Sequence, residues 1–530
     1  MPKKTPSIES SRSKTILITI YLCFIFILAK LFYWQIIKGQ ELRDKATSQL
    51  YRLETLIPKQ GHLLSSDSFP LSLDYTYFIL SFYKPNFKIE LPQILAEIEK
   101  IKPGFIIENT KVLEIFNNPA QKWVEFKTEF NREEMQALSK ISGLDFTLKQ
   151  ARFYPEDDLA KNIIINLERY YRRKISGRIG FSRSIVDGVG SNLLTRKNWQ
   201  KNEIDGEDIQ LSLNRKVQLL AETTIKKSIQ TYDADSASVI IIKPQSGEIL
   251  AMASSEASPS ALISKIPGIS DLFEPGSIFK PLTMASALDS GSINGDFICQ
   301  KCNQPRVIGK YTINNWDEQF HPDSTLKDII KNSDNIGMSY IIERMGQKIF
   351  LDYFHRLKLD QKTGIELSGE SISPLKTYWS EIDLATAAFG QGFAVNQLQM
   401  IEAFNTLANR GEIVTLHLTN QKKAEYTRVF SEDTIQKMNQ ILKYAVENSP
   451  VSKLKEKDLE VCAKSGTAQV AISGQYTDSN TVGSYIGYSP CENPKYTMIV
   501  TINNPRSSQW GSSTAAPVWF EIAQNLEFLL

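Results

Sequence analysis

The sequence predicts a multidomain protein of mixed α+β and α/β class. It would have a single N-terminal transmembrane helix, an α+β region after it, and a C-terminal domain in which helices cover an antiparallel sheet. Three observations support this prediction. One long apolar run stands near the N-terminus, strand and helix patterns then alternate without a repeat, and a helix followed by a hairpin opens the last part. A chain of 530 residues has room for roughly two to four domains.

The N-terminal apolar run, Thr15–Ile37, departs most clearly from an otherwise average composition. As a helix, its 23 residues would span about 34 Å, enough to cross the hydrocarbon core of a membrane. A signal peptide is the alternative, but no small-x-small cleavage site follows Lys30. Basic residues outnumber acidic ones in residues 1–14, so the positive-inside rule predicts a cytoplasmic tail there. We therefore expect a single-pass cell-membrane protein, anchored by residues 15–37, whose remaining residues are exported.

Residues 38–205 form the predicted α+β region. Alternating apolar residues at Tyr75–Phe82 predict a strand, and the apolar spacing at Leu91–Ile101 and Arg132–Ile141 predicts two helices. Glycines at and after Ser176–Gly180 indicate turns near the end of this region. Nothing in its sequence resembles a catalytic cluster.

Residues 206–530 form the predicted C-terminal domain. A short strand is expected at Ile209–Leu213, and the helix after it carries its apolar residues on one stripe. Strands at Ala237–Ile242 and Glu248–Ala253 flank a turn with proline and glycine, which predicts a hairpin. A helix followed by a hairpin indicates a sheet that helices cover.

Composition and charge exclude several classes of function. Hydrophobic residues make up 42% of the chain, charged residues 23%, and 61 Lys and Arg balance 59 Asp and Glu. A disordered chain, a polytopic membrane protein and a nucleic-acid-binding protein are therefore disfavoured. The four His are scattered with no metal-ligand spacing, and Cys299 and Cys302 lack the two further ligands that zinc would need, so we expect no metal and no other cofactor. A Ser-His-Asp catalytic site is disfavoured for the same reason.

The first candidate catalytic pair is Ser277 and Lys280, in the segment EPGSIFKPLTMASALDSG. A turn at Pro275-Gly276 precedes a helix that Ser277 would head, and residues three apart lie on one helix face. A nearby base or cation can activate a serine hydroxyl, so this arrangement could form an acyl-enzyme without histidine. Taken alone the pattern is weak, because Ser-x-x-Lys starts at other serines as well, Ser373 among them.

Two further elements follow in the same region. Ser333-Asp334-Asn335 stands between a helix end and the predicted helix Ile336–Arg344, where polar side chains could face a cleft or simply cap the helix. Lys464 begins a small-residue stretch inside a predicted strand. The positive charge of Lys464 and the neighbouring hydroxyls suit the binding of a carboxylate, and the glycine permits close backbone approach. The alternative is a solvated edge strand with no role in binding. The candidate substrate-binding residues after Lys464 are Ser465, Gly466 and Thr467.

The order of these three motifs, separated by 56 and 131 residues, resembles the penicillin-binding proteins, whose signatures are Ser-x-x-Lys, Ser-x-Asn and Lys-Ser/Thr-Gly. The resemblance continues through the active-serine segment and through AFGQGFAVNQLQMIEAFNTLANRG, where Asn396 replaces the more usual threonine. It implies a transpeptidase domain with a serine β-lactamase-like fold at 206–530 and an elongated, non-catalytic pedestal at 38–205.

The resemblance also implies a reaction on the D-Ala-D-Ala end of peptidoglycan stem peptides. Ser277 would form the acyl-enzyme and Lys280 would accept its proton, which requires a neutral amine that burial beside Lys464 could provide. Ser333 would relay a proton to the leaving amine, and Asn335 would hold the donor amide. Ser465 and Thr467 would bind the terminal carboxylate, and β-lactams would acylate Ser277 as inhibitors.

Among such proteins the chain resembles the monofunctional class B, since the pedestal shows no paired carboxylates for glycosyl transfer. The stretch TMASALDSG favours a division-type enzyme over an elongation-type one. Expected partners are then a lipid-linked glycan polymerase and divisome membrane proteins. A D,D-carboxypeptidase, a β-lactam sensor, a serine β-lactamase and a non-catalytic scaffold are the alternatives; length and topology disfavour the sensor and the lactamase.

The cysteines leave one question open. Cys299 and Cys302 could form a short disulfide in an exported domain or remain two free thiols. Cys462 and Cys491 are interpreted as buried strand or loop residues, and Cys23 lies in the anchor.

Overall fold

The computed structural model describes residues 8–83, 91–116, 122–141, 143–187, 192–193, 198–258, 265–472 and 475–530. The chain divides into two compact units. The first comprises Met1–Gln60 and Ser176–Glu207, and the second comprises Gly61–Ile175 and Asp208–Leu530. Residues 61–175 of the predicted α+β region therefore belong to the same compact unit as the C-terminal domain.

The first unit contains the apolar helix and a small antiparallel sheet. Helix α1 (Ile8–Phe32) ends in a π-helical turn, η1 (Tyr33–Ile37), before α2 (Gly39–Leu50). Residues Arg12–Ile37 are long and apolar enough to cross a membrane, as the sequence predicts for 15–37. In the sheet, β6 (Gly180–Val186) pairs with β1 (Tyr51–Leu56), β7 (Asn192–Leu193) and β8 (Trp199–Lys201).

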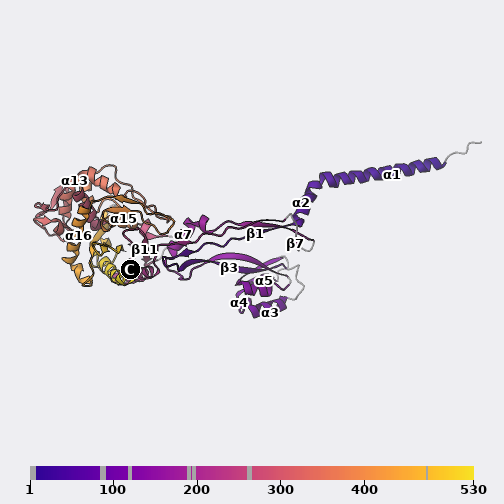
Figure 1. Ribbon diagram of the computed structural model, residues 1–530, viewed down its shortest axis with the longest axis horizontal. Coiled ribbons are helices and arrows are strands. Elements are labelled where there is room, and N and C mark those ends of the chain that lie inside the picture. The colour runs from indigo at the N-terminus through magenta and orange to yellow at the C-terminus, as the bar shows by residue number, and fades with distance from the viewer. Residues whose placement is uncertain are drawn as a thin grey trace, which may run out of the picture. The chain divides into compact units, whose positions relative to one another are not determined.

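The first part of the second unit is a five-stranded sheet with helices beside it. The order is β4-β3-β2-β9, and β5 also pairs with β3. Figure 1 shows α3, α4 and α5 gathered near the end of β3. The predicted strand and both predicted helices are confirmed, although the second helix ends at Leu138. The strands are β2 (Leu63–Leu64), β3 (Pro70–Tyr83), β4 (Trp123–Phe130), β5 (Leu144–Phe153) and β9 (Ile209–Gln210); the helices are α3 (Leu91–Ile101), α4 (Phe105–Glu108), α5 (Thr110–Phe116), α6 (Arg132–Leu138), α7 (Lys161–Tyr170) and α8 (Arg172–Ile175).

The second sheet of this unit is antiparallel, with strand order β11-β10-β22-β21-β20. Its strands are β10 (Ser236–Ile242), β11 (Ile249–Glu256), β20 (Cys462–Ile472), β21 (Gln475–Ser489) and β22 (Tyr496–Asn503). Alternate residues of one strand enter different cores: Val239 and Ile241 pack with Trp519, whereas Ile240 and Ile242 pack with the other helical layer. Helices α9 (Arg215–Tyr232) and α17 (Ala515–Leu529) supply the core around Trp519. The predicted hairpin and the sheet covered by helices are confirmed.

The remaining elements of this unit lie between β11 and β20 along the chain. The helices are α10 (Pro267–Ser270), η3 (Gly276–Phe279), α11 (Lys280–Asp289), α12 (Leu326–Lys331), α13 (Asn335–Arg356), α14 (Glu381–Ala387), α15 (Gln397–Ala408), α16 (Glu432–Glu447) and η4 (Pro450–Leu454). Short paired strands join them: β12 (Leu272–Phe273) with β17 (Val395–Asn396), β13 (Ile298–Cys299) with β16 (Ser324–Thr325), β14 (Arg306–Ile308) with β15 (Tyr311–Ile313), and β18 (Glu412–Val414) with β19 (Tyr426–Arg428).

Helix α15 is buried along its whole length and carries one acidic residue, Glu402, whose side chain is 1% exposed. Among the described residues, neither of its carboxylate oxygens has a hydrogen-bond partner. Burial raises the pKa of Glu402 to about 7, although the charges of Lys358 and Lys422 act in the opposite direction. The carboxyl group is therefore easiest to bury when it is protonated.

We expect Glu402→Gln to stabilise the protein at pH 8 and to change little at pH 4.5. The folded-state pKa lies above the unfolded-state value, so the wild-type free energy of unfolding falls as pH rises from 4.5 to about 7. The full difference is about 3 kcal/mol. Urea unfolding at both pH values measures it, with exposed Glu129→Gln on β4 as the control. An equal effect of Glu402→Gln at both pH values would contradict the prediction.

Candidate active site

Ser277 lies in the tight turn η3, just before helix α11 begins at Lys280. Gly276 immediately before it has φ 58°, and its N–H donates to the carbonyl oxygen of Gly390 at 2.9 Å. A Cβ at Gly390 would lie 2.2 Å from the backbone oxygen of Gly276, so only glycine permits this contact. Gly390 belongs to the AFGQGF segment that carries the family resemblance, and this segment thus fixes the turn that presents Ser277.

Ser333 and Asn335 lie where α12 ends and α13 begins. Ser333 has φ 55°, a left-handed conformation that costs a non-glycine residue about 1–3 kcal/mol. The buried carboxylate of Asp334 caps α13 by accepting from the N–H of Gly337 at 2.8 Å. The helix-cap alternative is therefore correct for Asp334, while Ser333 bonds Ser277 and Asn335 bonds Lys280.

Lys464 and the three residues after it lie on β20, at the edge of the five-stranded sheet. The strand is an edge strand, but Lys464 is only 5% exposed, so the solvated alternative is wrong for this side chain. Its ammonium group donates to the carbonyl oxygen of Ser465 at 2.8 Å. Gly466 packs on the Ser277 turn, since a Cβ there would lie 2.9 Å from the Cγ2 atom of Ile278.

Hydrogen bonds join the first two motifs into one site, and the third motif meets the Ser277 turn by packing. Ser333 Oγ donates to Ser277 Oγ at 2.9 Å. Lys280 Nζ donates to Ser333 Oγ at 3.1 Å and to Asn335 Oδ1 at 2.7 Å, and it also bonds the carbonyl oxygen of Ser333. Ser333 therefore stands between the candidate nucleophile and the candidate base. The structure brings Ser277, Lys280, Ser333 and Asn335 together although they are distant in sequence.

The electrostatics of the site favour neutral lysine. Lys280 is fully buried, and burial followed by the positive charge of Lys464 lowers its pKa well below the usual value, while Asp334 raises it. Burial lowers the pKa of Lys464 to about 7. Lys280 Nζ also lies 5.9 Å from the ring centroid of Phe389. A neutral amine at Lys280 can accept a proton, which is the state that serine activation requires.

Sequence reasoning missed a group of residues that hold these side chains in place. Asn335 donates from its side chain to the carbonyl oxygen of Asn314 at 3.0 Å, and its backbone N–H donates to Asn315 Oδ1 at 2.9 Å. On the opposite wall, the N–H of Gly511 donates to Thr467 Oγ1 at 3.0 Å. These residues lie in loops distant from every motif, and the sequence carries no signal that could have identified them.

Asn396 and the cysteines have structural roles that the sequence left undefined. Asn396, which stands where threonine is more usual, caps α15 by accepting from the N–H of Gln399 at 2.8 Å. This is a role that threonine also performs. Cys299 and Cys302 form a disulfide, and Cys462 and Cys491 form a second one. The interpretation of the second pair as simply buried residues was therefore incomplete.

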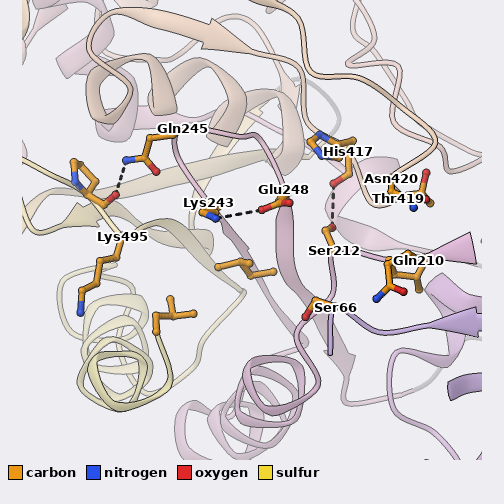
Figure 2. Close-up of a pocket in the computed structure, with 14 residues that line it drawn as sticks. Ser66, Gln210, Ser212, Lys243, Gln245, Glu248, His417, Thr419, Asn420 and Lys495 are labelled. Atoms are coloured by element: carbon orange, nitrogen blue, oxygen red, sulfur yellow. Dashed lines mark hydrogen bonds and ion pairs between the residues drawn. The ribbon is translucent and has the colours of Figure 1, made fainter. Parts of the chain in front are cut away.

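A cavity of about 600 Å³ elsewhere in the second unit also contains serine, histidine and glutamate, as Figure 2 shows. The Ser212 hydroxyl donates to the backbone oxygens of Ile249 and His417, at 2.8 and 3.3 Å. Lys243 and Glu248 form a 3.7 Å ion pair. Because Ser212 bonds the backbone of His417, these residues form no nucleophilic triad, and no predicted site residue lines the cavity. In the described part of the chain, no cluster of His, Cys, Asp and Glu could hold a metal ion.

Residues 237–524 match the family model for the penicillin binding protein transpeptidase domain, which is more than half of the chain. The chain belongs to this family. This penicillin-binding protein is 25% identical to the probable peptidoglycan D,D-transpeptidase PenA of Neisseria meningitidis, over 98% of the chain and 93% of PenA. It is also 25% identical to stage V sporulation protein D of Bacillus subtilis, over 93% of this chain and 82% of that protein.

The solved structures agree on the fold. Penicillin binding protein 2X of Streptococcus thermophilus superimposes with a TM-score of 0.74 and 21% identity, over 90% of this chain and 80% of that one. The predicted family, its class B membership, its fold and its enzyme class as a serine transpeptidase are therefore confirmed.

Proposed function

We propose that this penicillin-binding protein cross-links peptidoglycan stem peptides through an acyl-enzyme on Ser277. The observation that carries the proposal is the hydrogen-bonded path from Ser277 through Ser333 to buried Lys280. PenA, similar over nearly the whole chain, is itself described as a probable peptidoglycan D,D-transpeptidase.

In the first half-reaction, Ser277 Oγ attacks the penultimate D-alanine carbonyl, and its proton passes to neutral Lys280, with Ser333 between them. The amide C–N bond breaks, and the terminal D-alanine leaves with a proton that Ser333 delivers. Ser465 and Thr467 bind the terminal carboxylate beside Lys464, and Gly466 lets this strand lie close to the Ser277 turn. The backbone N–H groups of Ser277 and Thr467 stabilise the oxyanion. Asn335 holds the donor amide.

In the second half-reaction, an amine of another stem peptide attacks the ester carbonyl. A new amide C–N bond forms, the ester C–O bond breaks, and the amine proton returns to Ser277 Oγ. The product is a cross-link between two strands.

The proposed cellular role is septal synthesis during division. The active-serine stretch favours it, and partners of that role would be a lipid-linked glycan polymerase and divisome membrane proteins. Residues 1–14 would be cytoplasmic, 15–37 the retained anchor, 38–205 the pedestal and 206–530 the extracytoplasmic transpeptidase domain. The two disulfides support export, because disulfides persist in oxidising compartments. A fluorescent fusion should gather at the septum, and a uniform lateral-wall signal would argue against the role.

The full chain in detergent should become covalently labelled by a fluorescent penicillin, and Ser277→Ala should not. Ser373→Ala is the matched control, since Ser373 also stands three residues before a lysine, and it should label like wild type. No labelling of folded wild-type protein, or equal labelling of Ser277→Ala, would overturn the active-serine assignment.

A further inference from the structure

Trp316 is fixed to the wall of the site that carries Ser333. It directly follows Asn314 and Asn315, both of which hold Asn335, and its indole N–H donates to the carbonyl oxygen of Asn332 at 2.9 Å. Despite this attachment the side chain remains 53% exposed. The ring is therefore held at the surface of the site rather than buried in the core.

Trp510 is fixed to the opposite wall. The next residue, Gly511, bonds the Thr467 hydroxyl, and a Cβ on Gly511 would lie 2.1 Å from the backbone oxygen of Gly466. The carbonyl oxygen of Trp510 accepts from Ser513 N–H at 3.0 Å. The loop that carries Trp510 is thus seated directly on β20 at the proposed carboxylate-binding residues.

The two indole rings meet across the site. Their centroids are 5.0 Å apart and their planes meet at 63°, an edge-to-face geometry in which aromatic rings attract each other. One ring is attached beside Ser333 and the other beside Thr467, so the contact joins the two walls. It does so at the end of the site where the terminal D-alanine would be bound and released.

We propose that Trp316 and Trp510 form an aromatic clasp that decides which nucleophile reaches the acyl-enzyme. The clasp rests on the proposed function, because it acts on the Ser277 ester. Closed, it keeps water from the side of the ester that the leaving D-alanine vacates. Opened by an arriving stem peptide, it admits the amine, and the exposed Trp316 ring offers the peptide an apolar surface.

The chemistry explains why such a device is useful. Water attack on the ester would break the same C–O bond and release a free acid, with one proton returned to Ser277 Oγ. Amine attack instead forms the cross-link. Both nucleophiles approach along the path by which the leaving amine departs, since transfer to the acceptor is the reverse of that step. A barrier on this path therefore selects between hydrolysis and transpeptidation. Acylation by a β-lactam releases no leaving group along this path, so its rate should not depend on the barrier.

The test measures acylation and deacylation separately on the full chain. Ser277 is first acylated with fluorescent penicillin, and the loss of label after removal of free drug gives the hydrolysis rate. Trp316→Ala and Trp510→Ala should each lose label about tenfold faster than wild type, while the acylation rate stays within about threefold. Trp199→Ala on β8 is the matched control, because that indole is 56% exposed and lies in the first unit. Trp316→Phe, which keeps a ring, should restore most of the slow hydrolysis.

The double variant Trp316→Ala/Trp510→Ala should lose label no faster than either single variant, because each one alone removes the contact. With an acyl-D-alanyl thioester as donor and free D-alanine as acceptor, the ratio of amide to acid product should fall in all three variants. Unchanged deacylation in Trp316→Ala, or single effects that multiply in the double variant, would overturn the clasp. If Trp510→Ala fails to fold, the comparison of Trp316→Ala with Trp316→Phe still tests the proposal. Absence of wild-type labelling would instead overturn the proposed function itself.

Discussion

Replacing Lys280 by methionine is expected to slow the acylation of Ser277 by about 10²–10⁴-fold, the usual loss when a general base is removed. Lys280 Nζ lies 3.1 Å from Ser333 Oγ, which bonds the nucleophile, so the proton path from Ser277 loses its base in this variant. Methionine has a similar length and suits the buried site. Removal of the amine leaves Asn335 Oδ1 and the Ser333 carbonyl oxygen without this donor, at a cost of about 1–3 kcal/mol for each group, so the variant should be less stable but still fold.

The pH dependence separates catalysis from folding. The Lys280 pKa is lowered by burial and by Lys464, so wild-type acylation should rise with pH as the amine loses its proton, and Lys280→Met should lack this rise. The stability of the protein should depend on pH through the same group. Below pH 10.5 the unfolded Lys280 binds more protons than the folded one, so the wild-type free energy of unfolding falls as the pH drops. Lys280→Met should lose that part of the dependence.

Stopped-flow acylation with a chromogenic cephalosporin across the pH range measures the rates, and urea unfolding measures the stability. Lys310→Met, on the turn between β14 and β15, is the control and should behave like wild type. Acylation of Lys280→Met within about tenfold of wild type would contradict the assignment of Lys280 as the base.

The sequence predicted what is encoded locally. The strand around Lys464 was predicted from its own residues, and so was the helix after the Pro275-Gly276 turn, although that helix begins at Lys280 rather than at Ser277. That the motifs lie in one site could be inferred only from their order along the chain and from the family resemblance. Their convergence is a tertiary property: Ser333 meets Ser277 because α12 ends in a left-handed turn.

The rest depended on contacts that no local pattern reveals. Asn314 and Asn315 are ordinary loop residues until the fold places them beside Asn335, and Gly511 becomes functional only because its loop lies on β20. The division of the chain was hidden for a related reason. Residues 61–175 share a core with residues after 208, and composition cannot show which segments are neighbours.

Gly466→Ala is expected to reduce acylation by about a hundredfold or more without unfolding the protein. A Cβ there would lie 2.6 Å from Ser484 Oγ, 2.9 Å from Ile278 Cγ2 and 3.1 Å from the Ile278 backbone nitrogen. The serine hydroxyl of β21 can rotate, but Ile278 belongs to the Ser277 turn and has no such freedom. Strand β20 and the turn must therefore move apart, and a misplacement of about 1 Å costs on the order of 10²-fold in rate.

The matched control for this prediction is Gly295→Ala. The nearest atom to a Cβ at Gly295 is Lys437 Cε at 3.9 Å, so alanine fits there without displacing its surroundings. Labelling with fluorescent penicillin gives the acylation rates, and circular dichroism with thermal melting verifies the fold. Gly466→Ala should retain a cooperative melt while its acylation falls, because the strain lies at the contact between β20 and η3 rather than in the core. Wild-type acylation in Gly466→Ala would show that the distance between strand and turn is not what positions Ser277.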